Sequence, residues 1–252
     1  MSNVKLSASA SSRRLLAELM GTALLVTMVV GSGIAAARLS PSDGGLQLLE
    51  NSTATVFGLA VLILMFGPVS GGHFNPVISA VDWLLTRRRP GSGLSSGGAV
   101  RYGAGQLVGA ILGALLANLM FDLPALQISG KDRITLGHGL GEIVATAGLV
   151  LLVFALARTG RAALSAAAVG AYIGAAYWFT SSTSFANPAV TVGRIFSDTF
   201  AGIAPTSALF FIAAQLLGGL VGLGLVRFFF PDAPVTAGLA VVPHPNHIPE
   251  ES

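Results

Sequence analysis

Two short stretches decide the fold of this chain: SGGHFNPV at residues 70–77 and SFANPA at residues 184–189. Each contains an asparagine followed by proline, as Asn75 and as Asn187. Proline is tolerated in the first turn of a helix, where its missing N–H costs no hydrogen bond, so each asparagine is expected at a helix N-cap. The apolar segment after each pair is shorter than the roughly 20 residues that cross a bilayer. The sequence therefore predicts two re-entrant half-helices.

The rest of the chain is apolar enough to lie in lipid. Hydrophobic residues make up 53% of the 252 residues, charged residues make up 10%, and the mean hydropathy is +0.76. These values exclude an ordinary soluble domain. Six apolar runs predict membrane-spanning helices, although the second is short unless it begins near Leu48. The six runs are residues 15–37, 53–66, 99–121, 140–157, 162–179 and 207–230.

An internal repeat relates the two halves of the chain. The stretch AGQLVGA at residues 104–110 recurs as AAQLLGG at residues 213–219. Glu18 and Glu142 each lie inside an apolar run, with a threonine four residues later. Each half holds three spans, and an odd number of spans makes the second half enter the membrane from the opposite side.

These patterns predict an all-α membrane protein of six transmembrane helices and two re-entrant half-helices. The two inverted three-helix repeats are expected over about residues 13–121 and 137–230, within one domain at residues 13–230. Residues 1–12 and the proline-rich residues 231–252 are expected to be tails.

The basic residues predict the orientation in the membrane. Six spans place both termini on one side, and that side holds all of the 14 lysines and arginines except Arg38, Lys131, Arg133 and Arg194. Cytoplasmic loops carry the excess of positive charge. Both termini are therefore predicted to be cytoplasmic, and the protein is predicted to be a multi-pass protein of the cell (inner) membrane.

The composition also excludes several classes of function. The chain has no cysteine, so it has neither a thiolate metal site nor a cysteine nucleophile. Its histidines, His73, His138, His244 and His247, lack the spacing of a helical metal site. No catalytic residue, metal or cofactor is predicted, and the protein is not expected to be an enzyme. The net charge is +3, but the basic residues are spread over loops, so no nucleic-acid partner is expected.

Inversion of the repeats has an electrostatic consequence at mid-membrane. It brings two helix N-termini together there, each carrying about half a positive charge. This field repels cations, while the amides of Asn75 and Asn187 can donate hydrogen bonds to a passing oxygen. Water and polyols suit such a site, and ions do not.

The two motifs, Asn75-Pro76-Val77 and Asn187-Pro188-Ala189, resemble the paired signatures of the aquaporin and aquaglyceroporin family, the major intrinsic proteins. The resemblance covers about residues 13–230. It implies a passive channel in the lipid bilayer for small uncharged solutes such as glycerol-like polyols and water. It also implies a homotetramer with one pore in each subunit.

The resemblance gives the buried polar residues a scaffolding role. In this family the glutamates that correspond to Glu18 and Glu142 accept hydrogen bonds from the half-helix loops. The alternative is a proton relay, because a carboxylate inside a membrane usually marks a functional site. Gln106 and Gln215 are expected to be structural as well. His73 is expected to be a hydrogen-bonded loop residue, with a pH gate as its alternative.

The chain departs from the family pattern at the selectivity filter. In a typical member the residue three positions after the second asparagine is arginine, and here it is Val190. Counting from the two asparagines gives the remaining filter positions as Thr55, Ala175 and Ser184. Such a filter is small and neutral, and therefore wider than that of a water-selective pore. A one-residue shift in the count for Thr55 and Ala175 would select a neighbour instead, or bring an aromatic residue nearer: Val56, Ala176, Phe57, Tyr177 or Trp178.

Arg194 lies four residues after Val190, on nearly the same helix face. It either replaces the lost charge at the outer vestibule or extends to water at the membrane surface. Similar filters occur in channels found beside bacterial arsenic-resistance genes, so neutral arsenite, which resembles glycerol, is a further expected solute. The alternatives to this function are a water-selective aquaporin and an inverted-repeat secondary transporter.

Overall fold

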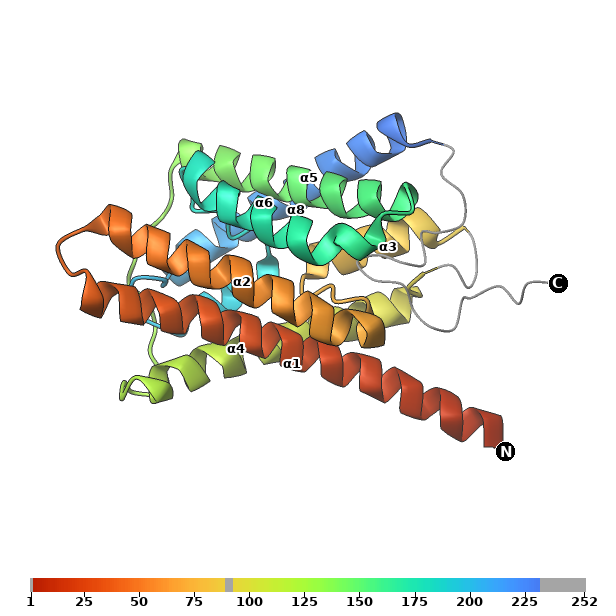
Figure 1. The fold of residues 1–252 in the computed structure, drawn as a ribbon, viewed down its shortest axis with the longest axis horizontal. Coiled ribbons are helices and arrows are strands. Elements are labelled where there is room, and N and C mark those ends of the chain that lie inside the picture. Colours follow the sequence, from red (N-terminus) through yellow and green to blue (C-terminus); the bar gives the residue numbers. More distant parts are fainter. Residues whose placement is uncertain (1, 89–92, 232–252) are drawn as a thin grey trace.

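The computed structural model describes residues 2–88 and 93–231, with side chains from residue 10 onward. This part of the chain is helical throughout and contains no strand (Figure 1). Its elements are α1 (Ser2–Leu39), α2 (Gly44–Ser70), α3 (Pro76–Thr86), α4 (Ser96–Met120), α5 (Leu136–Arg158), the 3₁₀ turn η1 (Ala162–Leu164), α6 (Ser165–Phe179), α7 (Pro188–Arg194) and α8 (Pro205–Phe229).

Six of these helical segments are long and apolar enough to cross a membrane, as the sequence predicts. They are α1 from Ala10, α2, α4, α5, η1 continued by α6, and α8. The helices α3 and α7 have only 11 and 7 residues. The predicted fold class, six spans with two short helices, is confirmed.

Two boundaries differ from the sequence prediction. The second span begins at Gly44, after Asp43, whose side chain accepts a hydrogen bond from the backbone N–H of Leu46. Its first turns look polar in the sequence, but Asn51 donates to the carbonyl of Val29 inside the bundle, at 2.9 Å. The first helix begins at Ser2, so residues 2–12 of the predicted tail continue α1. The predicted C-terminal tail lies outside the described residues, apart from Pro231.

The helices pack with the symmetry that an inverted repeat requires. Helix α1 contacts α2 and α4, and in the same way α5 contacts α6 and α8. Helix α3 lies against α4 and α8, and α7 lies against α8 and α4. In Figure 1, α1 runs from right to left and its repeat partner α5 runs from left to right. Exchange of the two halves therefore leaves these contacts unchanged, as the sequence repeat predicts, whereas the contact of α1 with α7 has no comparable counterpart between α5 and α3.

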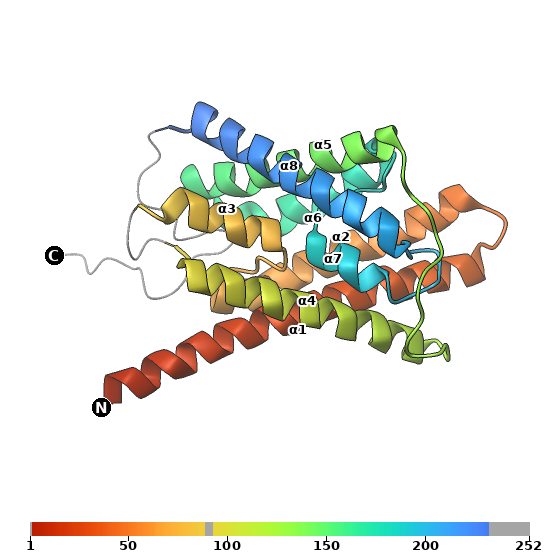
Figure 2. The same ribbon diagram turned by 180° about the vertical axis from the view of Figure 1, so that it is seen from behind.

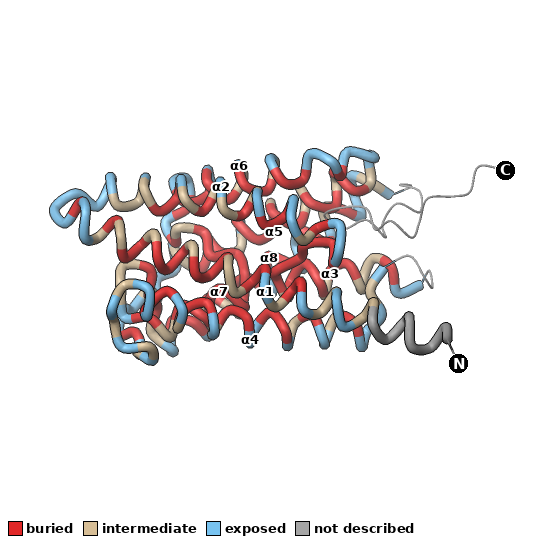
Figure 3. The backbone as a smooth tube through the Cα atoms, turned by 60° about the horizontal axis from the view of Figure 1, so that its bottom comes forward, coloured by how far each residue is buried: buried red, intermediate tan, exposed pale blue. Residues whose placement is uncertain are grey.

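The surface of the bundle is apolar where it would meet lipid. Large hydrophobic side chains are exposed on the transmembrane helices, among them Phe57 and Leu64 on α2 and Leu209 on α8, which is 72% exposed. Figure 3 shows the buried residues gathered on the inner faces of the helices. In water this surface would favour aggregation, whereas the hydrocarbon core of a bilayer is a solvent that matches it.

Glycines bring α1 and α4 into close contact. A Cβ atom on Gly109 would lie 2.2 Å from the carbonyl oxygen of Leu19, and one on Gly113 would lie 2.1 Å from that of Ala23. Backbone atoms cannot move aside as a flexible side chain can. The two helices can therefore pack this closely only with glycine at these positions, the small-residue packing typical of membrane bundles.

We expect Gly109→Ala to destabilise the protein by about 1–3 kcal/mol, the usual cost of overpacking. Gly103→Ala is the matched control on the same helix, because a Cβ there meets nothing within 4 Å. Its better helix propensity should leave stability unchanged or raise it by up to about 1 kcal/mol. Thermal unfolding of the purified protein in detergent measures both, and equal midpoints would contradict the packing argument.

Candidate functional site

The two asparagines cap the two short helices. The side-chain oxygen of Asn75 accepts from the backbone N–H of Val77, at 3.0 Å. That of Asn187 accepts from the N–H groups of Ala189 and Val190, at 3.0 and 3.3 Å. A proline follows each asparagine within the first turn. Both caps lie where the sequence predicts them, and Figure 2 shows α3 and α7 with these ends toward the middle of the molecule.

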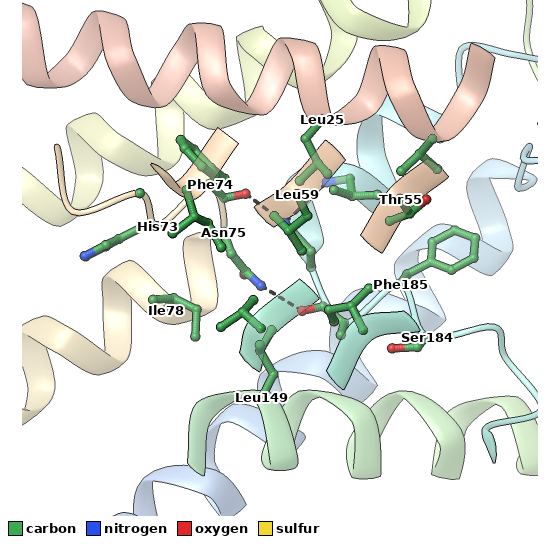
Figure 4. Close-up of a pocket in the computed structure, with 18 of the residues that line it drawn as sticks. Leu25, Thr55, Leu59, His73, Phe74, Asn75, Ile78, Leu149, Ser184 and Phe185 are labelled. Atoms are coloured by element: carbon green, nitrogen blue, oxygen red, sulfur yellow. Dashed lines mark hydrogen bonds between the residues drawn. The ribbon is translucent and has the colours of Figure 1, made fainter. Parts of the chain in front are cut away.

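The same two side chains join the loops to each other. The amide of Asn75 donates to the carbonyl of Ala186 at 2.8 Å, and the amide of Asn187 donates to the carbonyl of Phe74 at 2.7 Å (Figure 4). An amide nitrogen has two N–H groups, so each asparagine keeps one donor beyond this bond. Both asparagines line a cavity, where that donor can meet a solute oxygen.

Two fully buried carboxylates hold the loops that lead into the half-helices. Glu18 accepts from the backbone N–H groups of His73 and Phe74, at 3.0 and 2.7 Å. Glu142 accepts from those of Phe185 and Ala186, at 2.9 and 2.8 Å. Loop N–H groups at membrane depth need such partners because lipid offers none.

The two glutamines complete this arrangement on both sides. Gln106 donates to Glu18 at 2.7 Å, and Gln215 donates to Glu142 at 2.6 Å. Neither glutamate is among the residues that line the cavity. These contacts agree with the scaffolding role and give no support to a proton relay through the carboxylates.

The loop backbone adopts a conformation that side chains disfavour. Phe74, Ser184 and Ala186 have φ angles of 46°, 48° and 48°, in the left-handed region. Each non-glycine residue held there costs about 1–3 kcal/mol. The reversal turns consecutive N–H groups toward one carboxylate, as in an anion-binding nest. The bonds to Glu18 and Glu142 therefore hold a strained loop in place.

The cavity runs past both asparagines between α1, α2, α5 and α6 (Figure 4). Part of its wall is aliphatic, formed by Leu25, Val29, Leu59, Ile63, Leu149, Val153, Val169 and Ile173. The rest carries polar groups, from Thr55, His73, Asn75, Tyr177, Ser184, Asn187 and Arg194. The ring of His73 lies 3.0 Å from the hydroxyl of Ser79, so its side chain is hydrogen-bonded.

Three of the four residues that the sequence suggests for a filter line this cavity: Thr55, Ser184 and Val190. Ala175 does not, because its side chain is exposed on the outer face of α6. Tyr177 lines the cavity instead, with its hydroxyl 3.2 Å from that of Thr55. Residues two apart on a helix point about 200° apart, so a miscount of two exchanges the pore face for the lipid face.

The side chain of Arg194 lies inside the protein and does not extend to its outer surface. It is 2% exposed, lines the cavity, and donates through Nε to the carbonyl of Ala201. Its guanidinium lies over the ring of Phe185, 3.4 Å from the centroid. Phe185 also lines the cavity, and the sequence reasoning did not select it.

The loop beside this end of the cavity is positively charged. Lys131 donates to the carbonyl of Phe200, and Arg133 donates to those of Phe200 and Gly202. Burial, together with the neighbouring charges of Arg133 and Arg194, lowers the pKa of Lys131 to about 8. Arg133 and Arg194 therefore place positive charge beside Phe185 at this end of the cavity.

Comparison with known proteins agrees with this geometry. The family model for the major intrinsic proteins matches residues 5–184 and 163–249. The aquaglyceroporin AqpS of Rhizobium meliloti (strain 1021) is 47% identical over 224 residues, which cover 88% of this chain and 91% of that protein. Aquaporin Z of Photorhabdus laumondii is 31% identical over 247 residues, which cover 87% of this chain and 98% of that protein.

A solved structure shows the same fold. The X-ray structure of the aquaglyceroporin from Plasmodium falciparum matches 91% of this chain and all of that chain, with a TM-score of 0.60 and 19% identity. Fold and site together define a helical membrane channel and not an enzyme. The chain belongs to the major intrinsic protein family, as its paired Asn-Pro motifs predict.

We expect Asn187→Asp to let cations leak through the channel. The carboxylate can still cap α7, but it removes the donor to Phe74 and places a negative charge where two positive helix ends meet. Asn51→Asp is the matched control, because Asn51 is a buried amide that donates to a backbone carbonyl away from the cavity. Dye-monitored K⁺ and proton flux into proteoliposomes should rise only for Asn187→Asp. Unchanged cation exclusion in that variant would count against the electrostatic role of the site.

Proposed function

We propose that this channel conducts glycerol-like polyols and water by passive diffusion, and that neutral arsenite is among its solutes. The observation that carries the proposal is the mixed lining of the cavity, which combines aliphatic side chains with hydrogen-bonding groups. A polyol carries both carbon and hydroxyl groups, so it can contact both kinds of lining residue. Arsenite carries three hydroxyls and is uncharged, and so makes the same demands.

The proposed filter consists of Thr55, Tyr177, Ser184 and Val190. Ser184 belongs to the cavity wall, although its hydroxyl is buried and has no hydrogen-bond partner in the described part of the chain. Val190, 5% exposed, supplies an aliphatic contact where the typical family member has arginine. A filter of this kind leaves room for solutes larger than water.

Two other functions make different demands. A secondary transporter couples through charges at the binding site, whereas Glu18 and Glu142 are bonded to loop N–H groups and are not among the residues that line the cavity. A water-selective pore is favoured by one observation, the contact of Tyr177 with Thr55, which narrows the filter between α2 and α6. On the α7 side the filter is wider, because Val190 is smaller than the arginine of a typical family member.

We also propose a homotetramer in the cell (inner) membrane with both termini cytoplasmic. The start of α1 and the end of α8 lie at the same end of the bundle (Figure 1), and most lysines and arginines fall on that side. Membership of the major intrinsic protein family supports a multi-pass protein of the bilayer.

Stopped-flow light scattering on proteoliposomes tests the solute class. With osmotic gradients of sucrose, glycerol, urea and arsenite, we expect water, glycerol and arsenite to enter severalfold faster than into empty liposomes. The rates should rise linearly with concentration and should not depend on a proton gradient. Saturation or coupling to protons would indicate a transporter, and water flux alone would indicate a water-selective channel.

Val190→Arg tests the filter. The guanidinium adds volume and five donors to the pore, so glycerol flux should fall severalfold while water flux falls less. Val190→Leu is the control, because it adds volume without charge. Rates are compared per folded channel, since a buried unpaired arginine can cost about 2.5–3.5 kcal/mol in a membrane protein. Equal losses of water and glycerol flux would remove Val190 from the filter.

A further inference from the structure

Arg194 is a buried cation whose terminal nitrogens have no partner in the protein. Among the described residues, the only hydrogen bond of its side chain is the one from Nε to the carbonyl of Ala201, and no carboxylate pairs with it. The two terminal nitrogens nevertheless keep some accessible surface, and the residue lines the cavity. A buried guanidinium left in this state is costly unless another group uses its donors.

Phe185 fixes the direction of this guanidinium. The ring of Phe185 lies 3.4 Å from the guanidinium carbon on one side, and Arg133 lies 5.3 Å from the same ring. The ring is held in turn edge-on against Phe211, at 5.0 Å between centroids. The backbone N–H of Phe185 is bonded to Glu142. An aromatic face attracts a guanidinium and restricts its plane, so Phe185 can aim Arg194 into the cavity.

The residue at the corresponding position in the other half of the chain helps to distinguish two roles, loop anchoring and cavity lining. Asp82 lies seven residues after Asn75, as Arg194 lies seven residues after Asn187. Asp82 is buried and accepts from the backbone N–H of Leu94, so it anchors the loop after α3. It is not among the residues that line the cavity. Arg194 anchors the loop after α7 and also reaches the cavity, so loop anchoring alone does not account for it.

Arg194 stands one helical turn beyond the place where the family's typical filter has its arginine. Four residues of helix correspond to about 6 Å along the axis. Val190 shares a helix face with Arg194, so the arginine is attached about one turn further along α7 on the same side. Its long side chain places the guanidinium over the ring of Phe185, the residue that follows Ser184.

We propose that Arg194 is the solute-binding cation of this pore, displaced one turn outward, and that Phe185 is the positioning residue that holds it there. The inference rests on the proposed function and specifies where hydroxylated solutes are first bound. The guanidinium repels cations and its terminal nitrogens donate to solute hydroxyls, while Val190 occupies the position where the typical filter has its arginine. This arrangement admits polyols and still excludes ions.

Arg194→Met tests the proposal, because it keeps much of the side-chain volume and removes the charge. We expect K⁺ and proton leak into proteoliposomes to rise severalfold, and the activation energy of glycerol permeation to rise because the four N–H donors of the terminal nitrogens are lost. Arg38→Met is the matched control. Arg38 also lies over a phenylalanine ring, that of Phe121, and donates to a backbone carbonyl, but it is not in the cavity wall. The control should change neither quantity.

Two further variants test position and orientation. Phe185→Leu should raise the leak partway, and Phe185→Tyr, which keeps a ring, should not. The exchange Val190→Arg with Arg194→Val returns the arginine to the typical level. It should restore cation exclusion and lower glycerol flux relative to water.

The proposal is overturned if folded Arg194→Met, judged by thermal unfolding, excludes cations and conducts glycerol as the parent protein does. Arg194 would then be a loop anchor only. If Arg194→Met does not fold, the Phe185 pair decides, and equal leak in Phe185→Leu and the parent protein overturns the proposal. If the parent channel passes no glycerol but Arg194→Met still leaks cations, the proposed solute class is wrong. The role of Arg194 in excluding cations is then retained.

Discussion

Two loops reverse direction inside the bundle, and each exposes backbone N–H groups that no helix can satisfy. Glu18 and Glu142 meet this requirement, each accepting from two consecutive loop residues, and the fold depends on it. Without such acceptors at membrane depth, each unsatisfied group would cost several kcal/mol, and the left-handed residues beside them would relax. The half-helices, their caps and the cavity all follow once the two loops are fixed.

Much of this arrangement could be predicted from the sequence because it follows local rules. Proline after asparagine fixes the caps, and the repeat fixes how the halves are related. The filter was harder to predict. Ser184 and Val190 follow from Asn187 by adjacency, whereas the count back to α6 passes through a loop that reverses at Thr183, Ser184 and Ala186. Such a loop breaks the helical period, so the sequence selected Ala175, and the structure places Tyr177 in the cavity wall.

The burial of Arg194 was beyond sequence reasoning for a different reason. An arginine near a predicted helix end usually reaches water, and nothing in the local pattern says otherwise. Its guanidinium lies over Phe185, in the loop before α7, and its Nε donates to the carbonyl of Ala201, in the loop after α7. These contacts arise only in three dimensions. They also break the symmetry of the halves, since the matching position holds Asp82, which anchors a loop and does not line the cavity.

The crossed bonds of the two asparagines have a consequence for how the protein is made. Asn75 donates to Ala186, and Asn187 donates to Phe74, so each loop closes on a residue of the other half. A ribosome delivers the first loop long before the second, and until then the amide of Asn75 has no acceptor of its own. The first three spans can enter the membrane early, but they cannot complete their loop alone. The centre of the channel therefore cannot form until the second loop has been made, and a chain that stops before Ala186 lacks the crossed bonds that join the two loops.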